Sequence, residues 1–187
     1  MTNKHSDLKN EPFLLKPAGI EKIWGGSRLR DDFSKNIDSE KLAETWECST
    51  HPDGQSIVAS GVFKDLTLSE VISKNPEFLG KKLKKLSDLP ILVKLIDAQQ
   101  DLSIQVHPSD EHAKRLENLP KGKMEFWYVL DANKDSKLVY GLNHKLTTKQ
   151  LSESISDRSI EKYLQKIPVK KGDIFFVNPG TIHAIGA

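Results

Sequence analysis

The chain has 187 residues, of which 37% are hydrophobic and 29% charged, a composition typical of folded globular proteins. Its net charge of +2 is too small to favour a nucleic-acid-binding protein, and no apolar run is long enough for a membrane span or a secretory signal. Its single cysteine, Cys48, cannot form an internal disulfide, which fits a reducing cytoplasm, and we expect it to be a packing residue.

Residues 1–11 are polar, and we expect a flexible terminus followed by one folded domain over residues 12–187. Short apolar segments rich in β-branched and aromatic residues predict strands. These segments are residues 55–60, 90–98, 102–108, 124–132, 136–142 and 172–179. Many short strands without the regular alternation of strand and helix favour an all-β sandwich or barrel over a parallel sheet.

Helical signals are fewer than strand signals. Thr67 precedes a helical segment that Pro76 should interrupt, and Ser109 is a plausible N-cap for a second one. Residues 147–165 have the amphipathic pattern of one or two helices. We therefore expect helical insertions in a mainly β fold.

The segment LSIQVHP, residues 102–108, carries a polar face. Side chains of a strand alternate between its faces, so Ser103, Gln105 and His107 should point the same way. Leu102, Ile104 and Val106 should then point into apolar packing. Taken alone, this pattern is explained most simply by a solvent-exposed face of a surface strand.

The segment GKMEFWYVL, residues 122–130, places Lys123, Glu125 and Trp127 on one face of the next strand. Burying a charged side chain on a strand rich in aromatic residues costs free energy unless the charge is paired or bound to a metal. A surface face with a salt bridge is the alternative interpretation.

His183 follows Gly180, a glycine that would permit a left-handed backbone after the preceding strand. Three separate segments thus each supply one metal-competent side chain, namely His107, Glu125 and His183. Two histidines and a carboxylate suit a divalent metal such as zinc, with Gln105 as a neutral oxygen ligand and one position open for substrate or water. The other histidines, which we expect at the surface, are His5, His51, His112 and His144.

Six segments together carry a family resemblance: KIWGG (22–26), ETWECS (44–49), PILVKLIDA (90–98), LSIQVHP, GKMEFWYVL and GDIFFVNPGTIHAIG (172–186). In this order they resemble the type I mannose-6-phosphate isomerases (phosphomannose isomerases) of the short bacterial form, in the cupin superfamily. The spacing of Gly172, Gly180 and His183 resembles the second cupin motif. Gln105 stands where cupins usually have a histidine, and seventeen residues separate His107 from Glu125.

The resemblance implies an all-β-dominated fold, a cupin (jelly-roll) barrel with helical insertions. It also implies one zinc ion per chain, with Gln105, His107, Glu125 and His183 as ligands. Lys94 and Ser103 are similar to residues at the phosphate end of the substrate, and Lys123 is similar to a lysine near the reacting carbons. On the residues alone, the less favoured alternative is that Lys94 extends along the strand surface towards solvent.

The activity implied is an aldose–ketose isomerisation of mannose 6-phosphate and fructose 6-phosphate through a cis-enediol. The general base stays open between Lys123 and a group downstream. The family also implies an arginine and a further cupin-like domain after the HAIG motif, so we expect the sequence to end before the rest of such an enzyme. Two alternatives remain: a non-catalytic cupin module that binds metal and sugar phosphate, and an iron dioxygenase with two histidines and a carboxylate.

Overall fold

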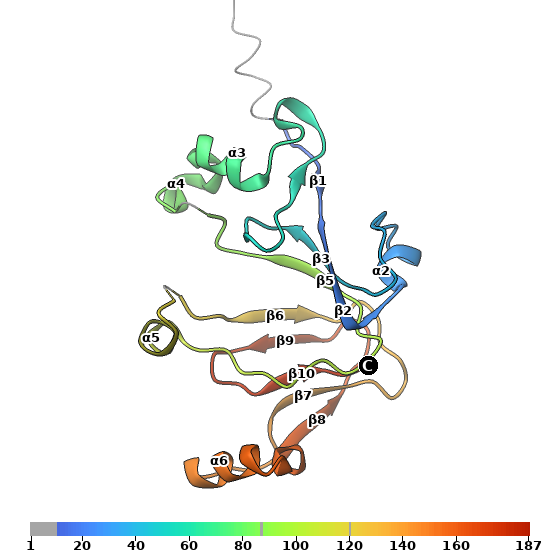
Figure 1. Ribbon diagram of the computed structural model, residues 1–187, viewed down its shortest axis with the longest axis vertical. Helices are drawn as coiled ribbons and strands as arrows, with labels where there is room; N and C mark the ends of the chain where they lie inside the picture. Colours follow the sequence, from blue (N-terminus) through green and yellow to red (C-terminus); the bar gives the residue numbers. More distant parts are fainter. Residues whose placement is uncertain (1–10, 87, 120) are drawn as a thin grey trace, which may run out of the picture. The chain divides into compact units, whose positions relative to one another are not determined.

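The computed structural model describes residues 11–86, 88–119 and 121–187, so nearly all of the expected flexible terminus lies outside the described residues. The chain divides into two compact units, Met1–Gln99 and Gln100–Ala187 (Figure 1). No helix in the described ranges is long and apolar enough to cross a membrane.

The first unit is built on a three-stranded antiparallel sheet of order β2-β3-β5, formed by Ala18–Gly26, Leu42–Cys48 and Val93–Ile96. A second, two-stranded sheet pairs β1 (Leu15–Lys16) with β4 (Ile57–Val58). The central strand β3 buries Leu42 and Ala43 completely. Because β3 has a partner on both sides, its backbone hydrogen bonds are satisfied along both edges.

The helices of the first unit are short. The helix predicted after Thr67 is α3 (Leu68–Lys74), and Thr67 caps it in a reciprocal capping box with Glu70. The helix buries Leu68, Val71 and Ile72, and it ends before Pro76. The remaining helical segments are α2 (Arg28–Asp31), η2 (Gly61–Phe63), η3 (Pro76–Leu79) and α4 (Gly80–Leu83).

The second unit contains two antiparallel sheets (Figure 1). One has the order β10-β7-β8, formed by His183–Ile185, Lys137–Leu142 and Leu164–Pro168. The other pairs β6 (Glu125–Tyr128) with β9 (Ile174–Val177). Its helical segments are α5 (Asp110–His112), η4 (Ala113–Glu117), α6 (Thr148–Ser156) and η5 (Ser159–Tyr163).

The two faces of the β6–β9 pair differ in character. Phe126 and Phe176 are register partners whose rings lie 5.1 Å apart, and both are more than half exposed. Glu125 and Trp127, one residue either side of Phe126, project from the opposite and more buried face. The one charged residue of β6, Glu125, therefore lies on the more buried face.

The expected mainly β fold is confirmed in part, as a sheet-rich fold with helical insertions. The strands of the described residues form four separate sheets and no closed barrel, because β6–β9 and β10-β7-β8 are not joined by a continuous ladder. Helical segments are also more numerous than an all-β-dominated fold implies, and the predicted helical stretch 147–165 runs into strand β8 at Leu164. The chain is a sheet-rich fold with helical insertions.

The segment 102–108 is extended but is not a regular strand. It forms one isolated bridge, Gln105 to His183, with reciprocal backbone hydrogen bonds of 2.9 Å. The prediction that its second face enters apolar packing was wrong, since Ile104 and Val106 are 42% and 55% exposed. The segment is held through its backbone and not through that apolar face.

The N-cap of helix α6 (Thr148–Ser156) can be tested by a single substitution. The side chain of its N-cap, Thr147, accepts a hydrogen bond from the Gln150 backbone N–H, and Gln150 accepts one in return. We expect Thr147→Ala to lower the free energy of unfolding by about 1 kcal/mol, the usual cost of a lost N-cap. Urea denaturation would measure it. Thr148→Ala, one residue later and inside the helix, is the matched control and should cost less than about 0.5 kcal/mol; equal losses would contradict the capping argument.

Candidate metal centre

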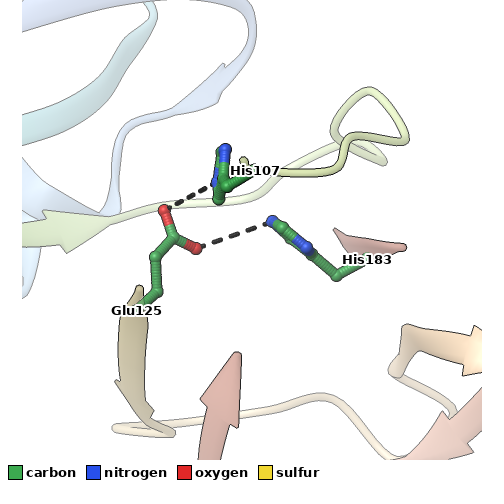
Figure 2. A group of neighbouring side chains, drawn as sticks. All are labelled: His107, Glu125 and His183. Carbon is green, nitrogen blue, oxygen red and sulfur yellow. Dashed lines mark ion pairs between the residues drawn. The ribbon is translucent and has the colours of Figure 1, made fainter. Parts of the chain in front are cut away.

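Three side chains from separate segments of the second unit converge (Figure 2). His107 comes from the extended segment, Glu125 is the first residue of β6, and His183 is the first residue of β10. Each offers one ligand atom, and these atoms all lie within 4.8 Å of one another. The three side chains that the sequence singled out therefore form one compact group.

Backbone pairing explains why the two histidines meet. Gln105 lies opposite His183 in the isolated bridge, and His107 lies two residues further on, on the same side of an extended chain. The Gly180 N–H donates to the His107 carbonyl at 2.8 Å, which ties the turn before β10 to the same segment. Gly180 has φ +84°, the left-handed conformation that the sequence suggested for it.

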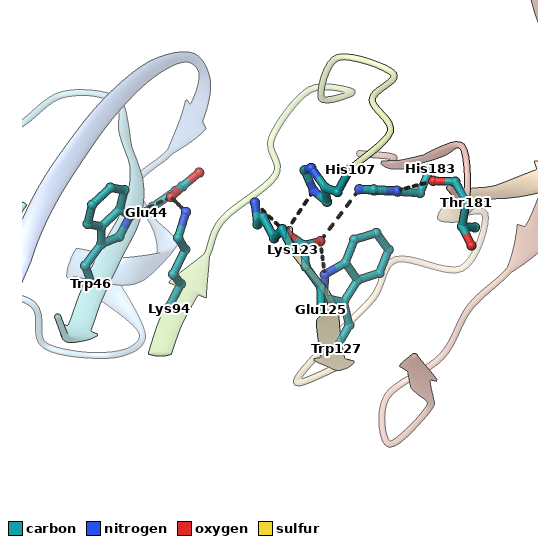
Figure 3. A network of polar contacts seen from close by, with 9 residues as sticks. All are labelled: Glu44, Trp46, Lys94, His107, Lys123, Glu125, Trp127, Thr181 and His183. Atoms are coloured by element: carbon teal, nitrogen blue, oxygen red, sulfur yellow. Dashed lines mark hydrogen bonds and ion pairs between the residues drawn. The ribbon is translucent and has the colours of Figure 1, made fainter. Parts of the chain in front are cut away.

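The carboxylate of Glu125 lies between the two imidazoles (Figure 2). Its Oε1 is 3.2 Å from His107 Nε2, and its Oε2 is 3.6 Å from His183 Nε2. Lys123 Nζ lies 2.8 Å from Oε1, and the indole Nε1–H of Trp127 donates to Oε2 at 3.1 Å (Figure 3). Each carboxylate oxygen thus has one imidazole and one other nitrogen beside it.

The imidazole of His183 is fixed in one orientation. The side chain is fully buried, and its Nδ1 lies 2.8 Å from the Thr181 carbonyl oxygen. A carbonyl oxygen can only accept, so Nδ1 carries a proton, and in the neutral imidazole Nε2 is then the atom with the lone pair. This arrangement is the usual one for a histidine that ligates a metal through Nε2.

Both Nε2 atoms, of His107 and of His183, are buried and have no hydrogen-bond partner among the described residues. Buried polar atoms are normally satisfied by a hydrogen bond, and the contact that each of these nitrogens makes is with one oxygen of the Glu125 carboxylate. Two such nitrogens aimed at one carboxylate fit a cation between them. The donor set of two nitrogens and a carboxylate therefore fits a divalent metal.

The ionisation of the group also favours metal binding. Burial lowers the pKa of His107, and the nearby charge of Lys123 lowers it further against the opposing pull of Glu125. Burial alone would raise the pKa of Glu125, but the hydrogen bond and charge of Lys123, with both histidines, outweigh it and lower that pKa. Neutral imidazole and ionised carboxylate are the forms that bind metal.

The structure places the other candidate residues as follows. Gln105 is half-buried and pairs through its backbone with His183, whereas Ser103 is exposed. Lys94 belongs to the first unit, where it donates to Glu44 Oε2 at 2.9 Å and lies 4.5 Å from the ring centre of Trp46 (Figure 3). Both of these contacts of Lys94 are therefore made within the first unit.

Among the described residues, three further histidines are not members of the group. His51 contacts Asp53, His112 pairs with Ser109, and His144 packs on Tyr163, while His5 falls outside the described residues.

Strand alternation predicts the face on which Trp127 lies, the same as that of Glu125, but predicts no role for its side chain. The sequence pattern that could have indicated a role is a tryptophan two residues after a glutamate on a predicted strand. The same spacing occurs at Glu44 and Trp46. In both places the indole N–H donates to the preceding carboxylate.

Comparison with known proteins identifies the family to which this chain belongs. The model of the type I phosphomannose isomerase catalytic domain matches residues 13–123. Mannose-6-phosphate isomerase ManA of Bacillus subtilis is 42% identical over 96% of this chain and 56% of its own length. The crystal structure of the mannose 6-phosphate isomerase from Bacillus subtilis superposes with a TM-score of 0.87 at 38% identity, covering 95% of this chain and 55% of that one.

A more distant solved structure, a mannose 6-phosphate isomerase bound with zinc and yttrium, shares the fold with a TM-score of 0.63 at 16% identity, covering 92% of this chain and 65% of that one. The chain spans about half the length of the curated relatives that it matches. The family match covers more than half of the chain, and its sequence and structure relatives agree with it. The chain belongs to the type I phosphomannose isomerase family.

Proposed function

We propose that this chain carries the metal-binding part of a mannose-6-phosphate isomerase, which interconverts mannose 6-phosphate and fructose 6-phosphate through a cis-enediol. The observation that carries the proposal is the pair of buried Nε2 atoms that converge on the Glu125 carboxylate, at 3.2 and 3.6 Å from its two oxygens. A site of this kind could support several reactions, and the family to which the chain belongs favours the isomerisation among them. The jelly-roll barrel of the cupin superfamily is part of the same proposal.

The ion proposed is zinc, one per chain, held by His107, Glu125 and His183 with Gln105 as a weaker fourth ligand. Nitrogen and carboxylate donors are the usual zinc ligands, and a fold neighbour was crystallised with zinc. When bound, such a cation supplies Lewis-acid stabilisation for negative charge that develops on the sugar oxygens.

Lys123 is proposed to act on the reacting end of the sugar. Its side chain is half exposed, so a ligand can reach it, and its Nζ lies 2.8 Å from the Glu125 carboxylate. An ammonium group has three donors and no acceptor, so Lys123 can bind Glu125 and still donate to a hydroxyl or carbonyl oxygen of the substrate.

Lys94 and Ser103 are proposed at the phosphate end. A lysine ammonium and a hydroxyl are suitable donors to a phosphate dianion. The ion pair with Glu44 and the contact with the Trp46 ring already restrict the Lys94 side chain. The conformational entropy that this side chain would lose on binding a ligand is therefore smaller.

An isomerase assay with controlled metal content tests this function. The 187-residue chain, and the longest reading frame that contains it, would be stripped with a chelator and reloaded with zinc. We expect conversion of mannose 6-phosphate to fall on stripping and return on reloading. Zinc binding without turnover in both forms would favour the non-catalytic binding module, and absence of zinc binding in both would overturn the proposal.

A further inference from the structure

The carboxylate of Glu125 is held by one donor on each oxygen (Figure 3). Lys123 lies 2.8 Å from Oε1, and the Trp127 indole N–H donates to Oε2 at 3.1 Å. The lysine side chain is half exposed, whereas the carboxylate side chain is only 20% exposed. The indole is the more rigid of the two donors, because it has two rotatable side-chain bonds against four in lysine.

The ring of Trp127 also contacts the buried histidine. Its centre lies 5.5 Å from that of the His183 imidazole, with an interplanar angle of 72°, an edge-to-face arrangement. Trp127 is paired in the ladder with Phe175 of β9, so its backbone position is fixed by the sheet. One side chain thus touches two of the three members of the metal group.

The contact between Trp127 and Glu125 follows from strand geometry. Residues two apart on a strand share a face, so an indole can reach back to a carboxylate two positions earlier. The first unit repeats the arrangement, since Trp46 Nε1–H donates to Glu44 Oε2 at 2.7 Å on β3. The repetition shows that this local geometry is accessible on two different β-strands of the chain.

We propose that Trp127 is a positioning residue of the metal centre, whose indole N–H orients the Glu125 carboxylate between the two imidazole Nε2 atoms. The proposal rests on the proposed metal site. A carboxylate already fixed in orientation loses less conformational freedom when it binds a cation, so the site binds more tightly. The ring edge against His183 limits the space into which that imidazole can turn.

Trp127→Phe tests the proposal by removing the N–H while keeping an aromatic ring. We expect zinc affinity, measured by competition with a chromophoric chelator, to fall by about 10- to 100-fold, the usual effect of losing a group that orients a ligand. The visible absorption spectrum of the Co²⁺-loaded protein should change as well, because it reports ligand geometry. Trp24→Phe is the matched control: Trp24 is also half-buried, and its indole makes no hydrogen bond to a carboxylate in the described part of the chain.

Equal zinc affinity and equal Co²⁺ spectra in Trp127→Phe and wild type would overturn the proposal. A loss of the same size in Trp24→Phe would also overturn it, because it would show a general effect of the substitution.

A measurement on the metal-free protein separates this inference from the metal site itself. The Trp127 indole proton should exchange slowly with solvent in NMR spectra, and Glu125→Ala should accelerate that exchange. If the wild-type chain bound no metal, the proposed function would be wrong. The hydrogen bond from Trp127 to Glu125 could still be detected by this exchange measurement. Fast exchange in wild type, or no response to Glu125→Ala, would contradict the positioning role whatever the metal result.

Discussion

Replacing His107 by alanine is expected to abolish stoichiometric zinc binding in a protein that still folds. The variant removes one of three converging ligand atoms, and its loss should weaken affinity by more than about 100-fold, beyond the effect of losing an orienting group. Folding should survive because His107 lies in an irregular extended segment held by backbone hydrogen bonds. Metal analysis after dialysis and circular dichroism would measure the two effects.

His144→Ala is the matched control for that variant. His144 is exposed and packs on Tyr163 outside the metal group, so its replacement should leave zinc content unchanged. Stoichiometric zinc retained by His107→Ala would remove His107 from the site.

Lys123→Met is expected to lower turnover by about 100- to 10,000-fold in whichever form of the protein is active, the range typical of a group that takes part in proton transfer. Methionine keeps an unbranched apolar stem and removes the ammonium, which lies beside the Glu125 carboxylate. Stability should change far less than turnover, because the lysine side chain is half exposed and the Trp127 indole N–H still donates to the carboxylate. Steady-state kinetics and thermal unfolding would separate these effects.

The control for Lys123→Met is Lys121→Met, which removes an exposed positive charge two residues away. Its turnover should match wild type. Wild-type turnover in Lys123→Met would show that Lys123 only balances the charge of Glu125. Zinc content must be measured in both variants, because the Lys123 charge helps to lower the pKa of Glu125 and its loss raises that pKa.

The metal group could be predicted from the sequence because its members follow simple periodic rules. Alternation placed Lys123, Glu125 and Trp127 on one strand face, and the glycine before His183 indicated the left-handed turn that the structure contains. The N-caps at Thr67 and Ser109 were also predictable, since each depends on a hydroxyl and the next three residues. Local rules of this kind need no knowledge of the distant chain.

The arrangement of the sheets could not be predicted in the same way. Strand β3 mixes charged and apolar residues, Leu-Ala-Glu-Thr-Trp-Glu-Cys, and its charges are satisfied by partners distant in sequence, such as Lys94 for Glu44. The exposure of Ile104 and Val106 likewise depends on which elements cover them, which alternation does not specify. The bond from Trp127 to Glu125 depends on a side-chain rotamer, for which one sequence has no signal.

The central claim is that His107, Glu125 and His183 hold one divalent metal. Crystals of the protein grown with zinc would test it most directly, through anomalous diffraction on either side of the zinc absorption edge. We predict one strong peak per chain at about 2.0–2.2 Å from His107 Nε2, His183 Nε2 and a Glu125 carboxylate oxygen, the usual zinc distances to such ligands. A peak elsewhere in the chain, or no peak at this group in zinc-saturated crystals, would contradict the account.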